Sequence, residues 1–338
     1  MQMTDATGWN HKPLANVSSK PAFGAGHLLA PIFALVMTIW IDPSYTGGDP
    51  SLYRYVYDSL GNETLSHGFF FYSVILSSTE PLYYFVVWIL THLGVPREVF
   101  IGLTSGLLAF LVVNILVRRG AHIIVATIIA SSSFYFLLLY TTTERLKLAV
   151  ILLIISVLTL DRIKISIFFA ILATAAHIQV AILYASFLAI FILQKLYADF
   201  REASISPRVI GTIAMAAIIL AGAYALIGGQ VSSKAGSYVG LGQMQDLLFV
   251  MPFYVATMFY TKQRFIVTIL FVPIILLSPI IGYGRLNMFS YFILLYYSVE
   301  KRGGLNVAVV ITSLYFAYSS FLFVNRILEF GDPLLVGQ

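Results

Sequence analysis

Two arginines stand at the start of apolar runs, where a positive charge is unusual. Arg145 follows the segment TTTE and Arg285 follows GYG, and each precedes residues apolar enough to form a helix. The N-terminus of a helix carries a partial positive charge, so a cation there is unfavourable unless an anion lies beside it. A guanidinium keeps its charge on burial and contacts two oxygens of a phosphate or carboxylate at once. We therefore expect a ligand or an acidic partner at both arginines.

Three other residues carry side chains that could accept a proton. His177 lies in the segment AAHIQ, Asp49 follows two glycines, and Glu80 precedes a proline. An imidazole or a carboxylate in such a place can take the proton of an attacking hydroxyl. Each residue also has a structural explanation: a buried histidine that only packs, an aspartate that shapes a turn, and a glutamate at a helix start. The sequence leaves both explanations open.

Other basic residues near the ends of apolar runs are weaker candidates. Lys234 and Arg54 are expected on the same side as Arg145 and could contact the same anion. Lys147 and Arg326 are expected to extend toward lipid headgroups, because long basic side chains near span ends usually do so. The aromatic segment LYRYVY, which contains Tyr53 and Tyr57, predicts an interfacial belt or an amphipathic helix, with a sugar platform as a further possibility.

Composition places the chain in a membrane. The 338 residues are 59% hydrophobic and only 10% charged, whereas soluble domains carry about 25% charged residues. The net charge of +5 does not indicate nucleic acid, because the basic residues are scattered between apolar runs. The absence of cysteine excludes disulfides and thiolate sites, and the six histidines lack metal-ligand spacing. We predict an all-α polytopic membrane protein.

The apolar runs predict about 11–12 membrane segments, including short or re-entrant helices. The polar N-terminal segment is too long for a signal peptide, so the first apolar run is expected to remain as a span. With the N-terminus inside, most Lys and Arg residues fall on the inner side, as the positive-inside rule requires. The predicted spans cover residues 23–41, 81–94, 99–117, 121–140, 146–160, 165–194 (two segments), 208–228, 247–260, 264–281, 285–299 and 305–324.

Two of these runs have alternative interpretations. Residues 81–94 are short and bounded by prolines, which favours a helix that dips into the membrane and returns; an extra crossing by residues 67–78 is the alternative. Residues 165–194 are expected to form two short helices that break near His177, unless they form one long tilted span. With either choice, the outer side collects the ionisable residues discussed above. Two arginines at that level suit a pyrophosphate headgroup whose lipid tail stays in the bilayer.

Four segments between residues 45 and 190 follow one another in a characteristic order. They read GGDPSLYRYVY, EPLYYFVVWIL, TERLKLAVILLIISVL and KISIFFAILATAAHIQVAILY. The series resembles the EpsG/Wzy-type family of bacterial polysaccharide polymerases. In that family an acidic residue and a tyrosine precede a Glu-Pro helix start, an arginine heads a helix, and a span of small residues ends in histidine. GYGRLNMFSYFILLYY matches a late arginine-bearing span, whereas Leu146 departs from the usual glutamine after the arginine.

The resemblance implies a GT-C-like glycosyltransferase in the bacterial inner membrane. Its expected reaction moves a growing glycan from undecaprenyl diphosphate to a hydroxyl of the next lipid-linked repeat unit at the periplasmic face, without metal or cofactor. The expected organisation is a cytoplasmic segment 1–22, one transmembrane domain 23–326 with periplasmic loops at about 42–80 and 229–246, and a tail 327–338. The expected partners are undecaprenyl-diphosphate-linked oligosaccharides, the bilayer and, as an open possibility, a chain-length regulator, with no nucleic acid.

The resemblance also implies a role for each candidate residue. Fixed cations must stabilise the departing diphosphate if no metal does so. His177 is expected to be the base or a second diphosphate contact, and Asp49 and Glu80 are competing bases. The remaining roles are diphosphate contacts by Arg145 and Arg285, weaker ones by Lys234 and Arg54, and sugar contacts by Tyr53, Tyr57 and Tyr283.

Two other function classes fit part of the same pattern. A ligase or a monosaccharide transferase that uses the same carrier would share the cations and differ in its acceptor. A flippase for lipid-linked oligosaccharides, or another transporter, should place charges along a path through the membrane. The unexplained charges here gather toward one face, which favours the enzyme.

Overall fold

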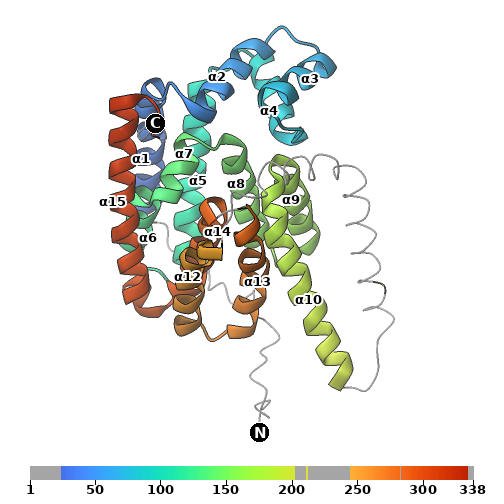
Figure 1. The fold of residues 1–338 in the computed structure, drawn as a ribbon, viewed down its shortest axis with the longest axis vertical. Helices are drawn as coiled ribbons and strands as arrows, with labels where there is room; N and C mark the ends of the chain where they lie inside the picture. The colour runs from blue at the N-terminus through green and yellow to red at the C-terminus, as the bar shows by residue number, and fades with distance from the viewer. Residues whose placement is uncertain (1–23, 202–210, 212–243, 282, 334–338) are drawn as a thin grey trace. The chain divides into compact units, whose positions relative to one another are not determined.

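The computed structural model describes residues 24–201, 211, 244–281 and 283–333. Within these ranges the chain consists of α-helices and short 3-10 turns, without a strand (Figure 1). The predicted all-α class is therefore confirmed for this part of the chain. Contacts divide the chain into two compact units, one of Met1–Val180 with Val299–Gln338 and one of Ala181–Ser298. The single domain 23–326 stays a prediction.

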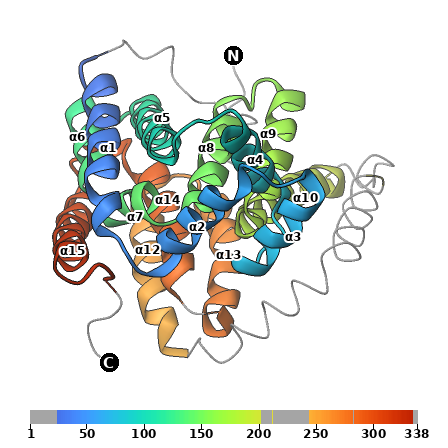
Figure 2. The ribbon, with the colours of Figure 1, turned by 90° about the horizontal axis from the view of Figure 1, so that it is seen from above.

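The first unit contains a bundle around α1 (Gly26–Ile41). This helix packs against α5 (Arg97–Arg118) and α6 (Ile123–Ser132), while α15 (Val307–Phe330) packs on α6 and on α7 (Phe134–Thr141), as Figure 2 shows from above. Gly106 lets α1 and α5 approach closely, because a Cβ there would lie 3.3 Å from the Pro31 carbonyl oxygen. The short turns η1 (Asp42–Ser44) and η4 (Lys301–Gly304) follow α1 and precede α15.

Several helices in the described ranges are long and apolar enough to cross a membrane. Three pass on length and composition, over Gly26–Ser44, Arg97–Arg118 and Lys301–Phe330, and the pair α6 and α7 makes a fourth if it is one broken span. These helices agree with a membrane protein of several spans. The pair bends by 55° at Ser133, whose extended backbone separates the two helices. The span predicted over residues 121–140 thus corresponds to a pair of helices with a bend between them.

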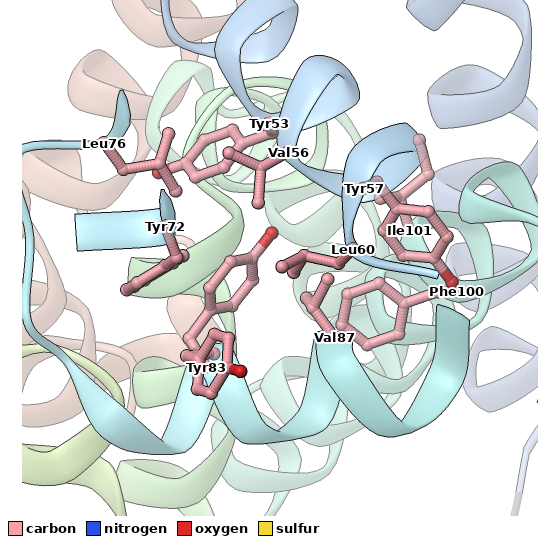
Figure 3. Packing of buried hydrophobic residues seen from close by; sticks show 11 residues of the cluster. Tyr53, Val56, Tyr57, Leu60, Tyr72, Leu76, Tyr83, Val87, Phe100 and Ile101 are labelled. Carbon is pink, nitrogen blue, oxygen red and sulfur yellow. The ribbon is translucent and has the colours of Figure 1, made fainter. Parts of the chain in front are cut away.

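The predicted outer loop at 42–80 is folded rather than extended. It forms α2 (Gly48–Leu60) and α3 (Leu65–Ile75), which pack with α4 (Pro81–His92) around a core rich in tyrosine (Figure 3). The amphipathic helix predicted from LYRYVY is confirmed in α2, whose buried face includes Tyr53 and Tyr57. Helices of 11 and 12 residues reach about 16–18 Å, less than the roughly 30 Å bilayer core. Neither α3 nor α4 is long enough for a full crossing, and re-entry of α4 stays a prediction.

The predicted break near His177 is confirmed. Helix α8 (Glu144–Leu158) packs on α9 (Ile163–Ala176), and His177 follows α9 with an extended backbone, φ −159° and ψ 119°. The 3-10 turn η2 (Ile178–Val180) comes next. One continuous span over residues 165–194 is therefore wrong.

The second unit contains α10 (Ala181–Arg201), η3 (Met244–Asp246), α12 (Leu247–Tyr260), α13 (Arg264–Ile281) and α14 (Tyr283–Ser298). Helix α12 packs against α13 and α14, and α10 packs against α13. Two prolines, Pro273 and Pro279, lie inside α13. The predicted spans 247–260, 264–281 and 285–299 correspond to helices, whereas the span 208–228 lies outside the described residues apart from residue 211.

Candidate functional site

Three sequence-predicted residues meet in the first unit. Arg145, in the first turn of α8, donates from Nη1 to Oε2 of Glu80 at 2.7 Å. Nδ1 of His177 lies 2.5 Å from Oε1 of the same carboxylate. Arg145 follows Glu80 by 65 positions in the chain and His177 follows it by 97, yet both side chains contact the same carboxylate. The expectation of a ligand or an acidic partner at Arg145 is met in the structure by an acidic partner.

Glu80 does not cap the helix that it precedes. It occupies the N-cap position of α4, but its side chain makes no capping hydrogen bond. The carboxylate instead accepts from Ser78 Oγ at 2.8 Å and from the Ile178 backbone N–H at 3.4 Å, in addition to its two cationic partners. Glu80 thus lies at a helix start, as expected, but its side chain forms other contacts instead of capping the helix. Both carboxylate oxygens are engaged, and the side chain is only 7% exposed.

The cationic neighbours decide the charge of Glu80. Burial alone would raise the pKa of its carboxyl group, but the hydrogen bond and charge of His177, with the charge of Arg145, hold the pKa well below its usual value. Glu80 therefore carries its negative charge at any physiological pH in this arrangement. A carboxylate with so low a pKa is a weak base.

Tyr53 completes the environment of Arg145. Its hydroxyl accepts from Arg145 Nε at 3.0 Å, and the guanidinium carbon lies 5.7 Å from the centre of its ring. Burial raises the pKa of Tyr53 to about 12, although Arg145 opposes the shift. The phenol therefore stays neutral and orients the guanidinium. Arg145 keeps 13% of its side chain exposed.

The surroundings of His177 fit a doubly protonated ring. Nε2 lies 3.1 Å from Oε1 of Gln179, while Nδ1 faces the carboxylate of Glu80. A neutral imidazole has one N–H donor and one acceptor nitrogen, so two oxygen partners at these positions suit the imidazolium. In this geometry His177 acts as a second cation beside Arg145.

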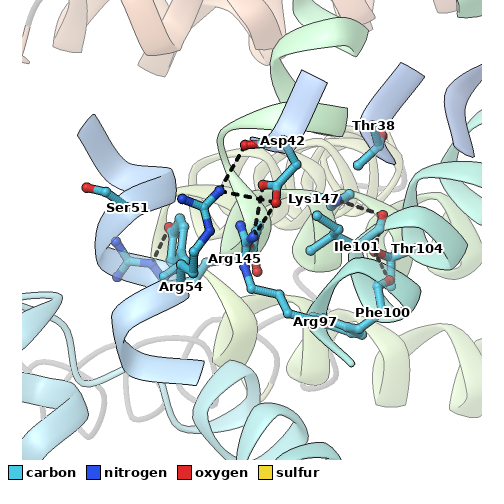
Figure 4. Close-up of polar contacts among 12 residues, drawn as sticks. Thr38, Asp42, Ser51, Arg54, Arg97, Phe100, Ile101, Thr104, Arg145 and Lys147 are labelled. Carbon is cyan, nitrogen blue, oxygen red and sulfur yellow. Dashed lines mark hydrogen bonds and ion pairs between the residues drawn. The ribbon is translucent and has the colours of Figure 1, made fainter. Parts of the chain in front are cut away.

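A second charged network lies beside the first, and it was not expected from the sequence. Arg97, which opens α5 after a proline, donates from Nη1 to both carboxylate oxygens of Asp42 at 2.8 Å (Figure 4). Its Nη2 donates to Oε1 of Glu144 at 2.5 Å, and Tyr83 donates to the other oxygen at 2.7 Å. All three charged residues are buried. Arg97 has the same signal as Arg145, a cation heading an apolar helix, and that signal could have found it.

Two adjacent residues at the start of α8 belong to different networks. Glu144 belongs to the Arg97 network and Arg145 to the Glu80 network. Successive residues on a helix point about 100° apart, so one helix start can serve both. The pairing of Glu144 with Arg97 and Tyr83 fixes the first turn of α8, and thereby the position from which Arg145 extends.

Comparisons with family models, curated proteins and solved structures find no match for this chain. The case for a function therefore rests on the residues themselves.

The other residues that the sequence suggested for the site have no described contact with Glu80. Arg54 donates to the backbone and side-chain oxygens of Asp42 at 2.9 and 3.2 Å, so in this structure it joins the Arg97 network. The Tyr57 hydroxyl donates to the Val95 carbonyl at 2.8 Å from a buried position, which favours packing over sugar contact. Asp49 is exposed in the first turn of α2. Lys234 and the side chains of Arg285 and Tyr283 lie outside the described residues, and their roles stay predictions.

The expectation that Lys147 extends to headgroups is wrong. Its side chain is 1% exposed, and Nζ donates to the Ile101 carbonyl, Ser105 Oγ and the Tyr140 carbonyl at 3.2, 3.0 and 3.1 Å. The three N–H groups of the ammonium thus have three oxygen acceptors. One acceptor lies in the last turn of α7, where carbonyls lack helical partners and a cation is favourable. Arg326, by contrast, is exposed.

Replacing Lys147 with methionine is expected to destabilise the first unit. The change removes a charged donor that links α5, α7 and α8, and charge-assisted hydrogen bonds of this kind contribute about 1.5–3 kcal/mol. We expect a melting temperature several degrees lower by tryptophan fluorescence in detergent. The exposed Lys164 offers the matched control, since Lys164→Met should leave the melting temperature unchanged. Equal melting temperatures for Lys147→Met and wild type would contradict the assigned role.

Proposed function

We propose that this chain is a membrane glycosyltransferase of the polysaccharide-polymerase type. Its donor is a glycan on undecaprenyl diphosphate, and its acceptor is a hydroxyl of the next lipid-linked repeat unit. The observation that supports this most is the convergence of Arg145 and His177 on one anionic group beside the neutral hydroxyl of Tyr53. Two fixed cations from distant segments form an arrangement that a diphosphate oxygen can occupy as well as a carboxylate.

The chemistry needs these groups for definite reasons. When the acceptor oxygen attacks the anomeric carbon, the bond from that carbon to the diphosphate oxygen breaks and its electron pair leaves with the diphosphate. Arg145 and His177 offset the charge that develops there, without reorganising at the moment of reaction. The acceptor hydroxyl must also lose its proton to a base, for which Glu80 and Asp49 are the acidic candidates within the first unit.

The finer features of the proposal come from the sequence. They are a GT-C-like arrangement of about 11–12 segments, an inner-membrane location with the N-terminus in the cytoplasm, and a site that faces the periplasm. Position 177 is expected to be reached from the side opposite to position 119. The chain has no native cysteine, so single cysteines at positions 49, 119 and 177 can be labelled without background from other cysteines. Labelling of position 177 only from the cytoplasmic side would contradict this orientation.

Reconstitution tests the activity itself. Purified wild-type protein in proteoliposomes should convert lipid-linked repeat units into a ladder of longer glycans on a gel. Movement of the units across the vesicle membrane without lengthening would instead identify a flippase. Transfer that requires an acceptor other than a second repeat unit would identify a ligase or a monosaccharide transferase. Either result would reject the polymerase.

A further inference from the structure

The anionic group between the two cations of the candidate site is part of the protein itself. Glu80 contacts Arg145 through one oxygen and His177 through the other, at 2.7 and 2.5 Å. A lipid diphosphate that uses the same cations must compete with this carboxylate. The structure therefore presents a site whose anion position is already filled by a side chain.

We propose that the lipid diphosphate displaces Glu80 from Arg145 and His177, and that the displaced Glu80 is the base that deprotonates the acceptor hydroxyl. This inference rests on the proposed function and assigns the base that the sequence left open. Binding of the donor thereby activates the group that the second substrate needs. Without a donor, the base stays paired with its cations.

The exchange of anions has a physical basis. A diphosphate carries more negative charge than a carboxylate and offers several oxygens to a guanidinium, so it can replace the carboxylate at Arg145. Glu80 keeps two neutral donors after the exchange, Ser78 Oγ and the Ile178 N–H, which hold it close to the reacting groups. Once the cations are neutralised by the diphosphate, burial and the new negative charge both favour the protonated carboxyl group.

The proton transfer then balances with the glycosyl transfer. The acceptor oxygen forms its bond to the anomeric carbon while its proton passes to an oxygen of Glu80. The bond from the anomeric carbon to the diphosphate breaks, and its electron pair stays on the diphosphate beside Arg145 and His177. Product release returns the proton to solvent and the carboxylate to its cations.

The two competing bases fit this step less well. The oxygen partners on both ring nitrogens of His177 match a ring that already carries both protons, so it has no free lone pair. Asp49 is exposed, and within the described residues its carboxylate forms no ion pair with Arg145 or His177. Glu80 contacts both Arg145 and His177, so its basicity depends directly on what else these two side chains bind.

The first experiment measures binding of inorganic pyrophosphate to the full-length protein in detergent by calorimetry. Glu80→Gln removes the competing charge, so pyrophosphate should bind at least about tenfold tighter, as expected if the cations are free less than about a tenth of the time in wild type. Glu63→Gln is the control for net charge, because Glu63 is partly exposed and pairs with the exposed His67. It should change the affinity less than about twofold. Unchanged or weaker binding by Glu80→Gln would overturn the exchange of anions.

The second experiment measures glycan extension by the same variants. Glu80→Gln should lose extension although it binds pyrophosphate more tightly, and formate should partly restore extension by Glu80→Ala, as an external base would. Extension by Glu80→Gln at the wild-type rate would overturn the assignment of the base. If wild-type protein extends glycans and Glu80→Gln gains no affinity, the inference fails while the proposed function stands. If Glu80→Gln gains affinity but wild-type protein extends nothing, the proposed function and the base both fail.

Discussion

Replacement of Arg145 with alanine should lower glycan extension by about 100-fold or more. Loss of one fixed donor to a developing anion typically costs a factor of about 10²–10³ in rate. Arg145 keeps its charge and is held from two directions, by Glu80 and by Tyr53. Extension can be measured in proteoliposomes with lipid-linked repeat units, after gel filtration has shown that the variant is folded.

Two further variants separate charge from geometry in this result. Arg145→Lys keeps a positive charge but lacks the planar guanidinium that contacts Glu80 and Tyr53 at once. It should therefore restore only a small part of the rate of glycan extension. Arg162→Ala is the matched control, because the Arg162 side chain is 73% exposed and lies 3.9 Å from its acidic neighbour. It should extend glycans at the wild-type rate. Wild-type activity in a folded Arg145→Ala protein would exclude a role for this residue in the reaction.

Replacement of Arg97 with methionine should have the largest effect on stability. Arg97 is the cation between two buried carboxylates, Asp42 and Glu144. Asp42 retains Arg54, but among the described residues Glu144 keeps only the neutral hydroxyl of Tyr83 as a hydrogen-bond partner of its carboxylate. Removing one partner of a buried ion pair costs about 3–5 kcal/mol, because the other charge is left without compensation. Thermal unfolding in detergent and the amount of protein in the membrane fraction measure the effect.

A compensating change tests the physical reason. If the uncompensated charge of Glu144 causes the loss, Arg97→Met combined with Glu144→Gln should be more stable than Arg97→Met alone. Arg326→Met, an exposed change of the same kind on α15, should leave stability unchanged. If the double variant is no more stable than Arg97→Met alone, the stability lost on replacing Arg97 comes from lost packing rather than from the charge of Glu144.

Much of the helical framework follows from the sequence, for identifiable reasons. Long apolar runs broken by polar or turn residues predicted the bounds of α1 and α5 to within three residues, because backbone groups in a bilayer are satisfied within a helix. The predicted span 305–324 ended six residues before α15 does. The break at His177 was also predictable, since basic segments flank a run that is long for one helix. The bend at Ser133 was not, because no proline or glycine marks it.

The partners in the site could be predicted only in part. The position of Arg145 at a helix start indicated an anion, but spacing alone does not tell that the anion is Glu80, 65 residues earlier. Lys147 was misplaced because its neighbours in sequence suggest a span end, while its acceptors belong to α5 and to the end of α7. The tyrosine core of α2, α3 and α4 was missed for a similar reason: each segment looks like a loop or an interfacial helix until the three pack together.

The long separations within both charge networks have a consequence for biogenesis. Asp42 is synthesised 55 residues before Arg97, and Glu80 is synthesised 65 residues before Arg145. At a synthesis rate of about 5–20 residues per second, roughly 3–13 s pass between the synthesis of Glu80 and that of Arg145. During that interval a carboxylate cannot enter hydrocarbon as an ion, so it must stay in water or within the insertion machinery. The contact between Glu80 and Arg145 can therefore form only after the first turn of α8 has been synthesised.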